Sequence, residues 1–180
     1  MRTAVFLDRD GTINQEVAYL HDPTDLALIP HAPDAIRTLN QRGILTILVT
    51  NQAGIGRGLY SEAAMHRVHA EMIRRLAAEG CHLDDVYFCP HHPDEACSCR
   101  KPAPGMLLQA AQEHALDLAA CYMIGDKITD VEAGHAAGCQ TILVLTGYGE
   151  QEQIKGTTFQ IGFIARDLLE AVQWIVQRIE

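Results

Sequence analysis

The sequence predicts an α/β fold, a doubly wound parallel sheet with helices on both faces. Short runs of branched apolar residues alternate along the chain with longer amphipathic segments, which is typical of such sheets. Polar residues follow directly after several of these runs, as expected where strand ends form a binding rim. With 180 residues, 48% of them hydrophobic and 21% charged, the chain is expected to form one domain over residues 1–180.

The first half of the chain contains two expected strands and two expected helices. Residues 3–7 are apolar and end in a polar turn, and residues 44–49 are rich in branched side chains. Between them, residues 33–42 begin with proline and end before Gly43, as helices commonly do. Ser61 is expected to cap a long helix, because apolar residues recur after it at three- and four-residue spacing, at Met65, Val68, Met72 and Leu76.

The second half continues the alternation. Residues 86–89, 122–124 and 140–145 are expected strands, whereas residues 104–114, 129–137 and 165–179 are expected helices. Gly138 would end the middle helix. Residues 150–163 show no pattern that predicts a role.

Charge and hydropathy exclude several classes of partner. The formal net charge is −9 and no basic run occurs, so a nucleic-acid partner is not expected. The longest apolar runs are too short to cross a membrane, and a charged residue comes too early for a secretory signal. We therefore expect a cytoplasmic protein without a membrane partner, and a monomer.

Three polar residues far apart in sequence are expected at one rim. Asp8, Thr50 and Asp126 each follow a predicted strand, and the carboxyl ends of parallel strands lie at the same edge. This convergence is the central structural prediction.

The turn Asp8–Thr12 offers two carboxylates suited to phosphoryl transfer. One carboxylate can attack phosphorus, and the second can protonate the leaving oxygen and later activate water. Gly11 permits the tight turn between them and the following residues. An Asp-x-Asp pair alone is as often a solvated turn or a helix cap, so the later Gly125-Asp126 pair is what favours a catalytic interpretation.

A cation is required, because two carboxylates would repel a phosphate dianion. Mg²⁺ fits, since it binds a few oxygen ligands together with substrate phosphate, and Asp126 is the expected third donor, with Asp130 one helical turn further. Lys101 could stabilise the transferring group, and Thr50 and Asn51 could contact phosphate oxygens. Taken alone, Lys101 would be an ordinary surface lysine and Thr50-Asn51 an ordinary cap.

A cysteine-rich loop predicts a structural zinc site. Three thiolates and one imidazole occur within eleven residues, a ligand set that suits tetrahedral Zn²⁺: Cys89, His91, Cys97 and Cys99. His92 is the alternative to His91. The zinc would position Arg100 and Lys101, which follow the last ligand directly.

These motifs, Asp8-x-Asp10-Gly11-Thr12, Thr50-Asn51, Lys101 and Gly125-Asp126, resemble in order the signature of the haloacid dehalogenase superfamily. The resemblance covers roughly residues 4–145. It implies Asp8 as nucleophile, Asp10 as general acid and base, and Thr50 and Lys101 as phosphoryl stabilisers. It also implies Mg²⁺ bound by Asp8, the Asp10 carbonyl and Asp126, in a Rossmann-like core without a cap domain.

The zinc loop resembles two phosphatase families, acting on D-glycero-D-manno-heptose 1,7-bisphosphate or on histidinol phosphate. The stretches at 50–58, 101–107 and 125–127 favour the heptose enzymes of nucleotide-activated heptose biosynthesis, but only five residues separate His91 from Cys97, as in the histidinol-phosphate type. Resemblance to the heptose enzymes implies that substrate contacts come from Glu16, Val17, Ala18, Tyr19, Thr50, Asn51, Gln52, Ala53, Arg100 and Lys127.

Two further alternatives remain at this stage. A sugar phosphotransferase would use the same chemistry, although its relatives usually carry a cap domain and residues 12–33 leave no room for one. A non-enzymatic zinc-binding interaction module would be expected to lack part of the phosphoryl machinery, and none of that machinery is missing from this sequence.

Overall fold

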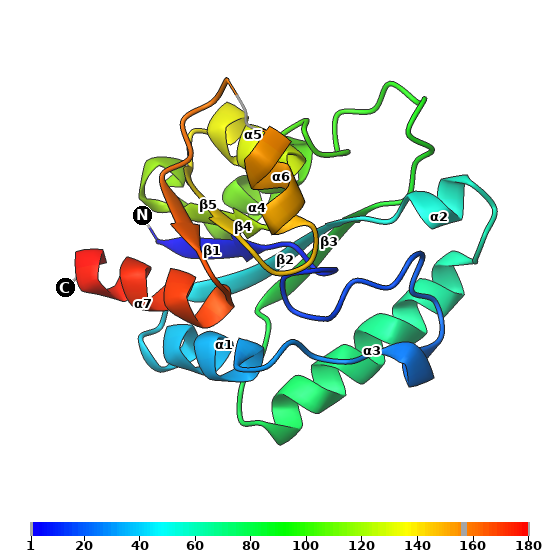
Figure 1. Ribbon diagram of the computed structural model, residues 1–180, viewed down its shortest axis with the longest axis horizontal. Helices are drawn as coiled ribbons and strands as arrows, with labels where there is room; N and C mark the ends of the chain where they lie inside the picture. Colours follow the sequence, from blue (N-terminus) through cyan, green and yellow to red (C-terminus); the bar gives the residue numbers. More distant parts are fainter. Residues whose placement is uncertain (1, 156–157, 180) are drawn as a thin grey trace.

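The computed structural model describes residues 2–155 and 158–179, and a six-stranded parallel sheet forms its centre (Figure 1). The strand order is β3-β2-β1-β4-β5-β6. The strands are β1 (Ala4–Leu7), β2 (Leu45–Asn51), β3 (Asp85–Cys89), β4 (Tyr122–Gly125), β5 (Gln140–Val144) and β6 (Phe163–Ala165). The order reverses at β1, which pairs with β2 on one side and β4 on the other. A ligand is expected at that switch point, beyond the carboxyl ends of the strands.

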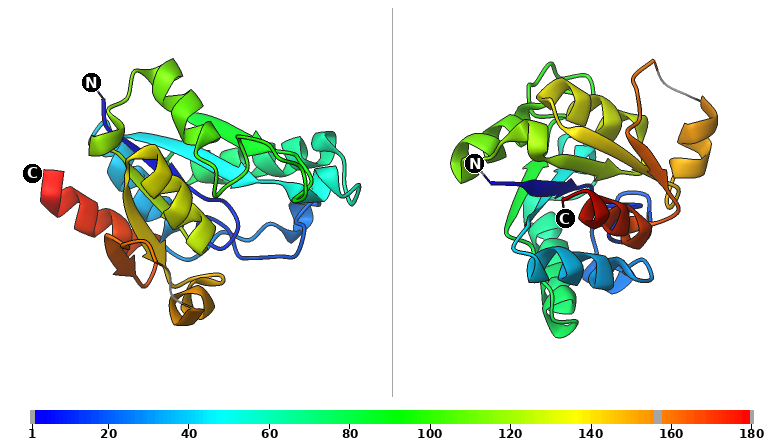
Figure 2. Two further views of the ribbon diagram at one scale, coloured as in Figure 1. Left: turned by 90° about the horizontal axis from the view of Figure 1, so that it is seen from above. Right: turned by 90° about the vertical axis from the view of Figure 1, so that its left-hand side faces the viewer.

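Helices cover both faces of the sheet, as predicted (Figure 2). One face packs on α1 (Ala32–Gln41), α3 (Glu62–Ala78) and α7 (Leu168–Ile179), and the other on α4 (Gly105–His114) and α5 (Ile128–Ala137). Strand β1 shows why both faces need cover, because Val5 and Leu7 enter one apolar core while Ala4 and Phe6 enter the other.

Several predicted boundaries follow from local signals that the structure reproduces. Ser61 caps α3, its hydroxyl accepting from the Ala64 amide at 3.2 Å. Gly138 ends α5 in the left-handed conformation, with φ of 87°.

The structure corrects the prediction near the carboxyl terminus. The helix expected from residue 165 begins at Leu168, and Ala165 instead ends β6. This edge strand has three residues, only one of them buried, so it carries too little alternation to be recognised. Two short helices were also missed, α2 (Ala53–Gly56) and α6 (Gly149–Lys155), together with the 3-10 turns η1 (Pro23–Asp25) and η2 (Leu118–Ala120).

No helix within the described residues is both long and apolar enough to span a membrane.

Candidate active site

Three carboxylates meet at the carboxyl ends of β1 and β4. Asp8 follows β1, Asp126 follows β4, and Asp130 lies in the first turn of α5. One oxygen from each lies within 4.8 Å of the others, and all three residues are buried. The structure therefore brings Asp8 and Asp126 together as predicted, with Asp130 beside them, one turn into α5.

Lys101 is the cation at the centre of this cluster. Its ammonium lies 2.8 Å from Asp8 Oδ1 and 2.6 Å from Asp130 Oδ1, and it donates to the Val49 carbonyl at 2.8 Å. Burial alone would lower the pKa of Lys101, but Asp130 and Asp8 raise it above its usual value. Lys101 is thus a buried, charged lysine rather than a surface one.

The acidic cluster has an excess of negative charge that a divalent cation would balance. Burial, followed by repulsion from Asp8 and Asp130, raises the pKa of Asp126 to about 8. Burial likewise raises the pKa of Asp130 to about 6, although Lys101 opposes the shift. Asp126 Oδ1 is buried and has no hydrogen-bond partner among the described residues. An all-oxygen donor set with an unpaired buried oxygen fits Mg²⁺.

The loop after β5 orients Asp126. The Tyr148 amide donates to Asp126 Oδ2 at 2.8 Å, which leaves Oδ1 free. Gly11 and Gly147 pack against that carboxylate, and a Cβ on either would lie 2.2 or 2.3 Å from Oδ2. Both glycines also have positive φ, 82° and 57°. Both the short distance to the Asp126 carboxylate and the positive φ therefore require glycine at positions 11 and 147.

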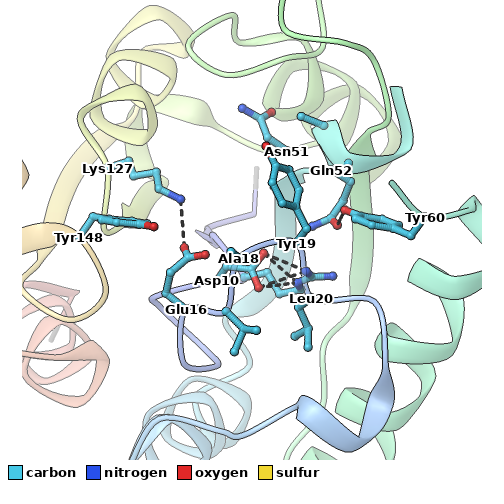
Figure 3. Close-up of a pocket in the computed structure, with 14 residues that line it drawn as sticks. Asp10, Glu16, Ala18, Tyr19, Leu20, Asn51, Gln52, Tyr60, Lys127 and Tyr148 are labelled. Carbon is cyan, nitrogen blue, oxygen red and sulfur yellow. Dashed lines mark hydrogen bonds and ion pairs between the residues drawn. The ribbon is translucent and has the colours of Figure 1, made fainter. Parts of the chain in front are cut away.

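Two cavities open beside the cluster, and Asp10 lines both. The smaller, about 40 Å³, is bounded by Asp8, Thr50 and Lys101 among others. The larger, about 360 Å³, is shown in Figure 3. A phosphoryl group in the smaller cavity and its organic part in the larger would place the bond between them next to Asp10.

The larger cavity contains most of the residues that the resemblance assigned to substrate binding. Its walls include Glu16, Val17, Ala18, Tyr19, Asn51, Gln52, Ala53 and Lys127. Lys127 Nζ lies 3.2 Å from Glu16 Oε2 and 4.9 Å from the centre of the Tyr148 ring (Figure 3). Burial raises the pKa of Glu16 despite Lys127. Burial alone would lower the pKa of Lys127, but Asp126, Asp8 and Glu16 raise it.

Other wall residues were not anticipated, chiefly Arg9, Tyr60 and Tyr148. The only feature of the sequence that could have indicated Arg9 is its position between the two predicted catalytic acids, Asp8 and Asp10. Tyr60 and Tyr148 lie in loops whose path depends on packing, and no local pattern marks them.

Two residues that were expected to contact substrate, Asn51 and Arg100, are placed differently. The Asn51 amide pairs with the Lys101 backbone, donating to its carbonyl and accepting from its amide, both at 3.0 Å. Arg100 lines neither cavity, and its Nη1 is buried with no hydrogen-bond partner among the described residues.

The predicted zinc ligands form a compact cluster after β3. The sulfur atoms of Cys89, Cys97 and Cys99 lie 3.0–3.6 Å apart, and His91 Nδ1 lies 3.4 Å from Cys89 Sγ and 3.2 Å from Cys99 Sγ. Zn–S bonds of about 2.3 Å give sulfur atoms about 3.8 Å apart in a tetrahedron, close to this spacing. His92 lies outside the cluster, its Nδ1 accepting from the Asp94 amide.

Known proteins resemble this chain along most of its length. A family model described as HAD-hyrolase-like matches residues 98–171. The D-glycero-beta-D-manno-heptose-1,7-bisphosphate 7-phosphatase of Yersinia pestis is 48% identical over 80% of this chain and 81% of its own. The D-glycero-D-manno-heptose-1,7-bisphosphate 7-phosphatase of Thermosynechococcus vestitus is 44% identical over 97% of this chain and 95% of its own.

A solved structure agrees with these relatives. The crystal structure of D,D-heptose 1,7-bisphosphate phosphatase from B. bronchiseptica, complexed with magnesium and phosphate, superposes with a TM-score of 0.93. It is 35% identical and covers 99% of both chains. The chain therefore belongs to the D-glycero-D-manno-heptose-1,7-bisphosphate 7-phosphatase family of haloacid-dehalogenase-like hydrolases.

Proposed function

We propose that this protein, as a single catalytic domain, hydrolyses the 7-phosphate of D-glycero-D-manno-heptose 1,7-bisphosphate in nucleotide-activated heptose biosynthesis. The observation that carries the proposal is the position of Asp10, between a small cavity beside Asp8 and Lys101 and a larger one lined by polar residues. Family membership names the substrate, and this geometry accounts for the chemistry.

In the proposed reaction Asp8 attacks phosphorus and Asp10 acts on the oxygen atoms. An Asp8 carboxylate oxygen forms a bond to phosphorus while the bond to the sugar oxygen breaks, and Asp10 protonates that oxygen. In the second step Asp10 accepts a proton from water, which attacks the phosphorus of the aspartyl-phosphate and releases phosphate. Lys101 and the Thr50 hydroxyl stabilise charge on the phosphoryl oxygens.

Two metals complete the proposed enzyme. Asp8, Asp126 and the Asp10 carbonyl would hold Mg²⁺, with Asp130 close by, and the ion would neutralise charge on the carboxylates and the phosphoryl oxygens. Cys89, His91, Cys97 and Cys99 would hold structural Zn²⁺. The six cysteines are unpaired, which favours a cytoplasmic location.

The sugar would occupy the larger cavity. Glu16 and Lys127 face its interior as an ion pair, suited to hydroxyl groups, and residues 17–19 and 51–53 complete the wall. Arg100 lines neither cavity, so a contact with the substrate would require its unpaired, buried Nη1 to turn toward the sugar.

Steady-state phosphate release with Mg²⁺ on heptose 1,7-bisphosphate and histidinol phosphate tests this proposal. A preference for the heptose of several hundredfold in kcat/KM, about 3–4 kcal/mol of transition-state binding, is expected. The opposite preference would assign the chain to the histidinol-phosphate enzymes, whose short zinc loop it shares. Asp8→Asn should abolish turnover and leave the fold intact, whereas retained activity would refute the nucleophile assignment.

A further inference from the structure

Arg9 is a buried cation that the proposed reaction does not yet use. It is 1% exposed and lies between the two catalytic acids in sequence. Its Nε and Nη2 lie 2.9–3.2 Å from the two carboxylate oxygens of Asp10. We propose that Arg9 is a positioning residue, which holds the Asp10 carboxyl group at the junction of the two cavities and stabilises the charge that forms there. The proposal rests on the assigned function.

The contact between Arg9 and Asp10 is directional. A guanidinium that meets a carboxylate through two nitrogen atoms fixes the plane of the carboxylate, which a lysine cannot do. Asn14 Nδ2 adds a third donor, 3.0 Å from Asp10 Oδ1. The Arg9 carbonyl also accepts from the amides of Thr12, Ile13 and Asn14, so the backbone of the turn is fixed as well. The groups that orient the Asp10 carboxylate therefore belong to the same turn, and no contact with substrate is needed.

The side-chain amide of Gln52 contacts Arg9 as well. The Gln52 amide lies 3.2 and 3.3 Å from Arg9 Nη2 and Nη1, and 2.7 Å from the Tyr60 hydroxyl. Because a guanidinium can only donate, the amide oxygen faces Arg9 and the amide nitrogen faces Tyr60. In Figure 3, Asp10 lies near the middle of the labelled residues, and Gln52 and Tyr60 lie on the right. The network thus runs from the catalytic carboxylate to an aromatic residue of the cavity wall.

The position of Arg9 suits the first chemical step. As the sugar oxygen leaves phosphorus, the O–H bond of the Asp10 carboxyl group breaks and the proton moves to that oxygen. Negative charge then develops on the Asp10 carboxylate, next to a buried guanidinium that is already in place. The guanidinium stabilises this charge and keeps the carboxylate at the junction, where it accepts a proton from water in the second step.

This role makes a prediction that a purely structural role does not. Protonation matters for an alkoxide leaving group but little for 4-nitrophenolate, which is stable as an anion. Loss of Arg9 should therefore impair sugar phosphates selectively. The ratio kcat/KM isolates this step, because it is insensitive to hydrolysis of the aspartyl-phosphate that both substrates share.

The experiment compares Arg9→Lys with the unaltered protein on heptose 1,7-bisphosphate and 4-nitrophenyl phosphate. We expect kcat/KM to fall about 100-fold or more on the heptose and less than about tenfold on the aryl phosphate. Asp10→Asn should show the same asymmetry. Equal losses on both substrates, or no loss on the heptose, would overturn the positioning role. Inactivity of the unaltered protein on both substrates would instead reject the proposed function.

Two further variants guard against an effect of folding. Arg75→Lys is the control, since Arg75 likewise pairs with a carboxylate, that of Glu71 on α3, and lines neither cavity. It should leave kcat/KM unchanged on both substrates. If Arg9→Lys does not fold, Tyr60→Phe removes only the hydroxyl behind Gln52. A selective loss on the heptose of a few-fold supports the network, and equal kcat/KM values refute it.

Discussion

The side-chain amide of Asn51 forms two hydrogen bonds with the backbone of Lys101, one to its carbonyl and one from its amide, each at 3.0 Å. This pair joins the end of β2 to the segment that follows the cysteine cluster, fifty residues later. From this backbone position the Lys101 ammonium lies 2.8 Å from Asp8 Oδ1 and 2.6 Å from Asp130 Oδ1. The neutral side chain of Asn51 therefore helps to fix the position of the Lys101 ammonium.

Asn51→Leu should displace Lys101 and lower kcat/KM about 10–100-fold, since small displacements in an active site have effects of this size. Asn40→Leu is a matched control, because the Asn40 amide makes the same pair of bonds with the His82 backbone far from the site. It should lower the melting temperature but leave activity unchanged. Similar kinetic losses in both variants would contradict a specific role for Asn51.

Gly147→Ala should weaken Mg²⁺ binding about tenfold or more, measured by isothermal titration calorimetry. A Cβ at this position would lie 2.3 Å from Asp126 Oδ2 and 2.6 Å from the Gly11 Cα, so the carboxylate must move. Gly43→Ala carries a similar positive φ, 67°, with no atom within 4 Å of the added carbon. The control should lose stability without losing Mg²⁺ affinity. Unchanged affinity in Gly147→Ala would show that Asp126 does not bind the ion.

Cys97→Ser should release the zinc, lower the melting temperature and reduce turnover. Cys97 is half-buried, and the segment from Cys99 to Lys101 begins at the last predicted ligand of the cluster. Zinc content by mass spectrometry and phosphate release are the measurements. Cys81→Ser alters a buried thiol outside the cluster and should retain the metal. Full activity in a zinc-free Cys97→Ser protein would show that the metal is dispensable for positioning Lys101.

The stability of the protein should fall in mild acid because of His69. Burial, with Arg9 and His66 nearby, lowers the pKa of His69 to about 3. The unfolded chain takes up this proton near pH 6.5 and the folded chain does not, so the stabilisation is complete above pH 6.5 and is lost toward pH 3. Between pH 7 and 5 this histidine should account for a loss of about 2 kcal/mol in the free energy of unfolding.

Urea denaturation of His69→Phe at pH 7 and pH 5 measures this contribution. The variant should lose about 2 kcal/mol less than the unaltered protein between the two values. Met72→Leu changes a buried, uncharged neighbour on the same helix and should keep the original pH dependence. An undiminished pH dependence in His69→Phe would mean that other groups cause the acid sensitivity.

The sequence by itself determined five of the six strands, the order of the motifs and the Cys/His cluster that is predicted to bind zinc. Strands such as β1 and β2 are buried on both faces, so they read as continuous apolar runs, and their carboxyl ends must meet in a parallel sheet. The four residues of this cluster lie within eleven positions of the chain, so a single loop is enough to bring them together. These features depend on local spacing or on a general property of parallel sheets.

Only the tertiary structure decided how the individual side chains meet. It placed Asp130 against Lys101, turned the Asn51 amide toward backbone, and brought the loops of Tyr60 and Tyr148 to the cavity. It also made Ala165 part of a strand, because pairing with β5 outweighed the helical pattern that begins nearby. Contacts at this site join residues as far apart in sequence as Glu16 and Lys127, 111 positions, and their geometry follows from packing of the whole core rather than from any local pattern.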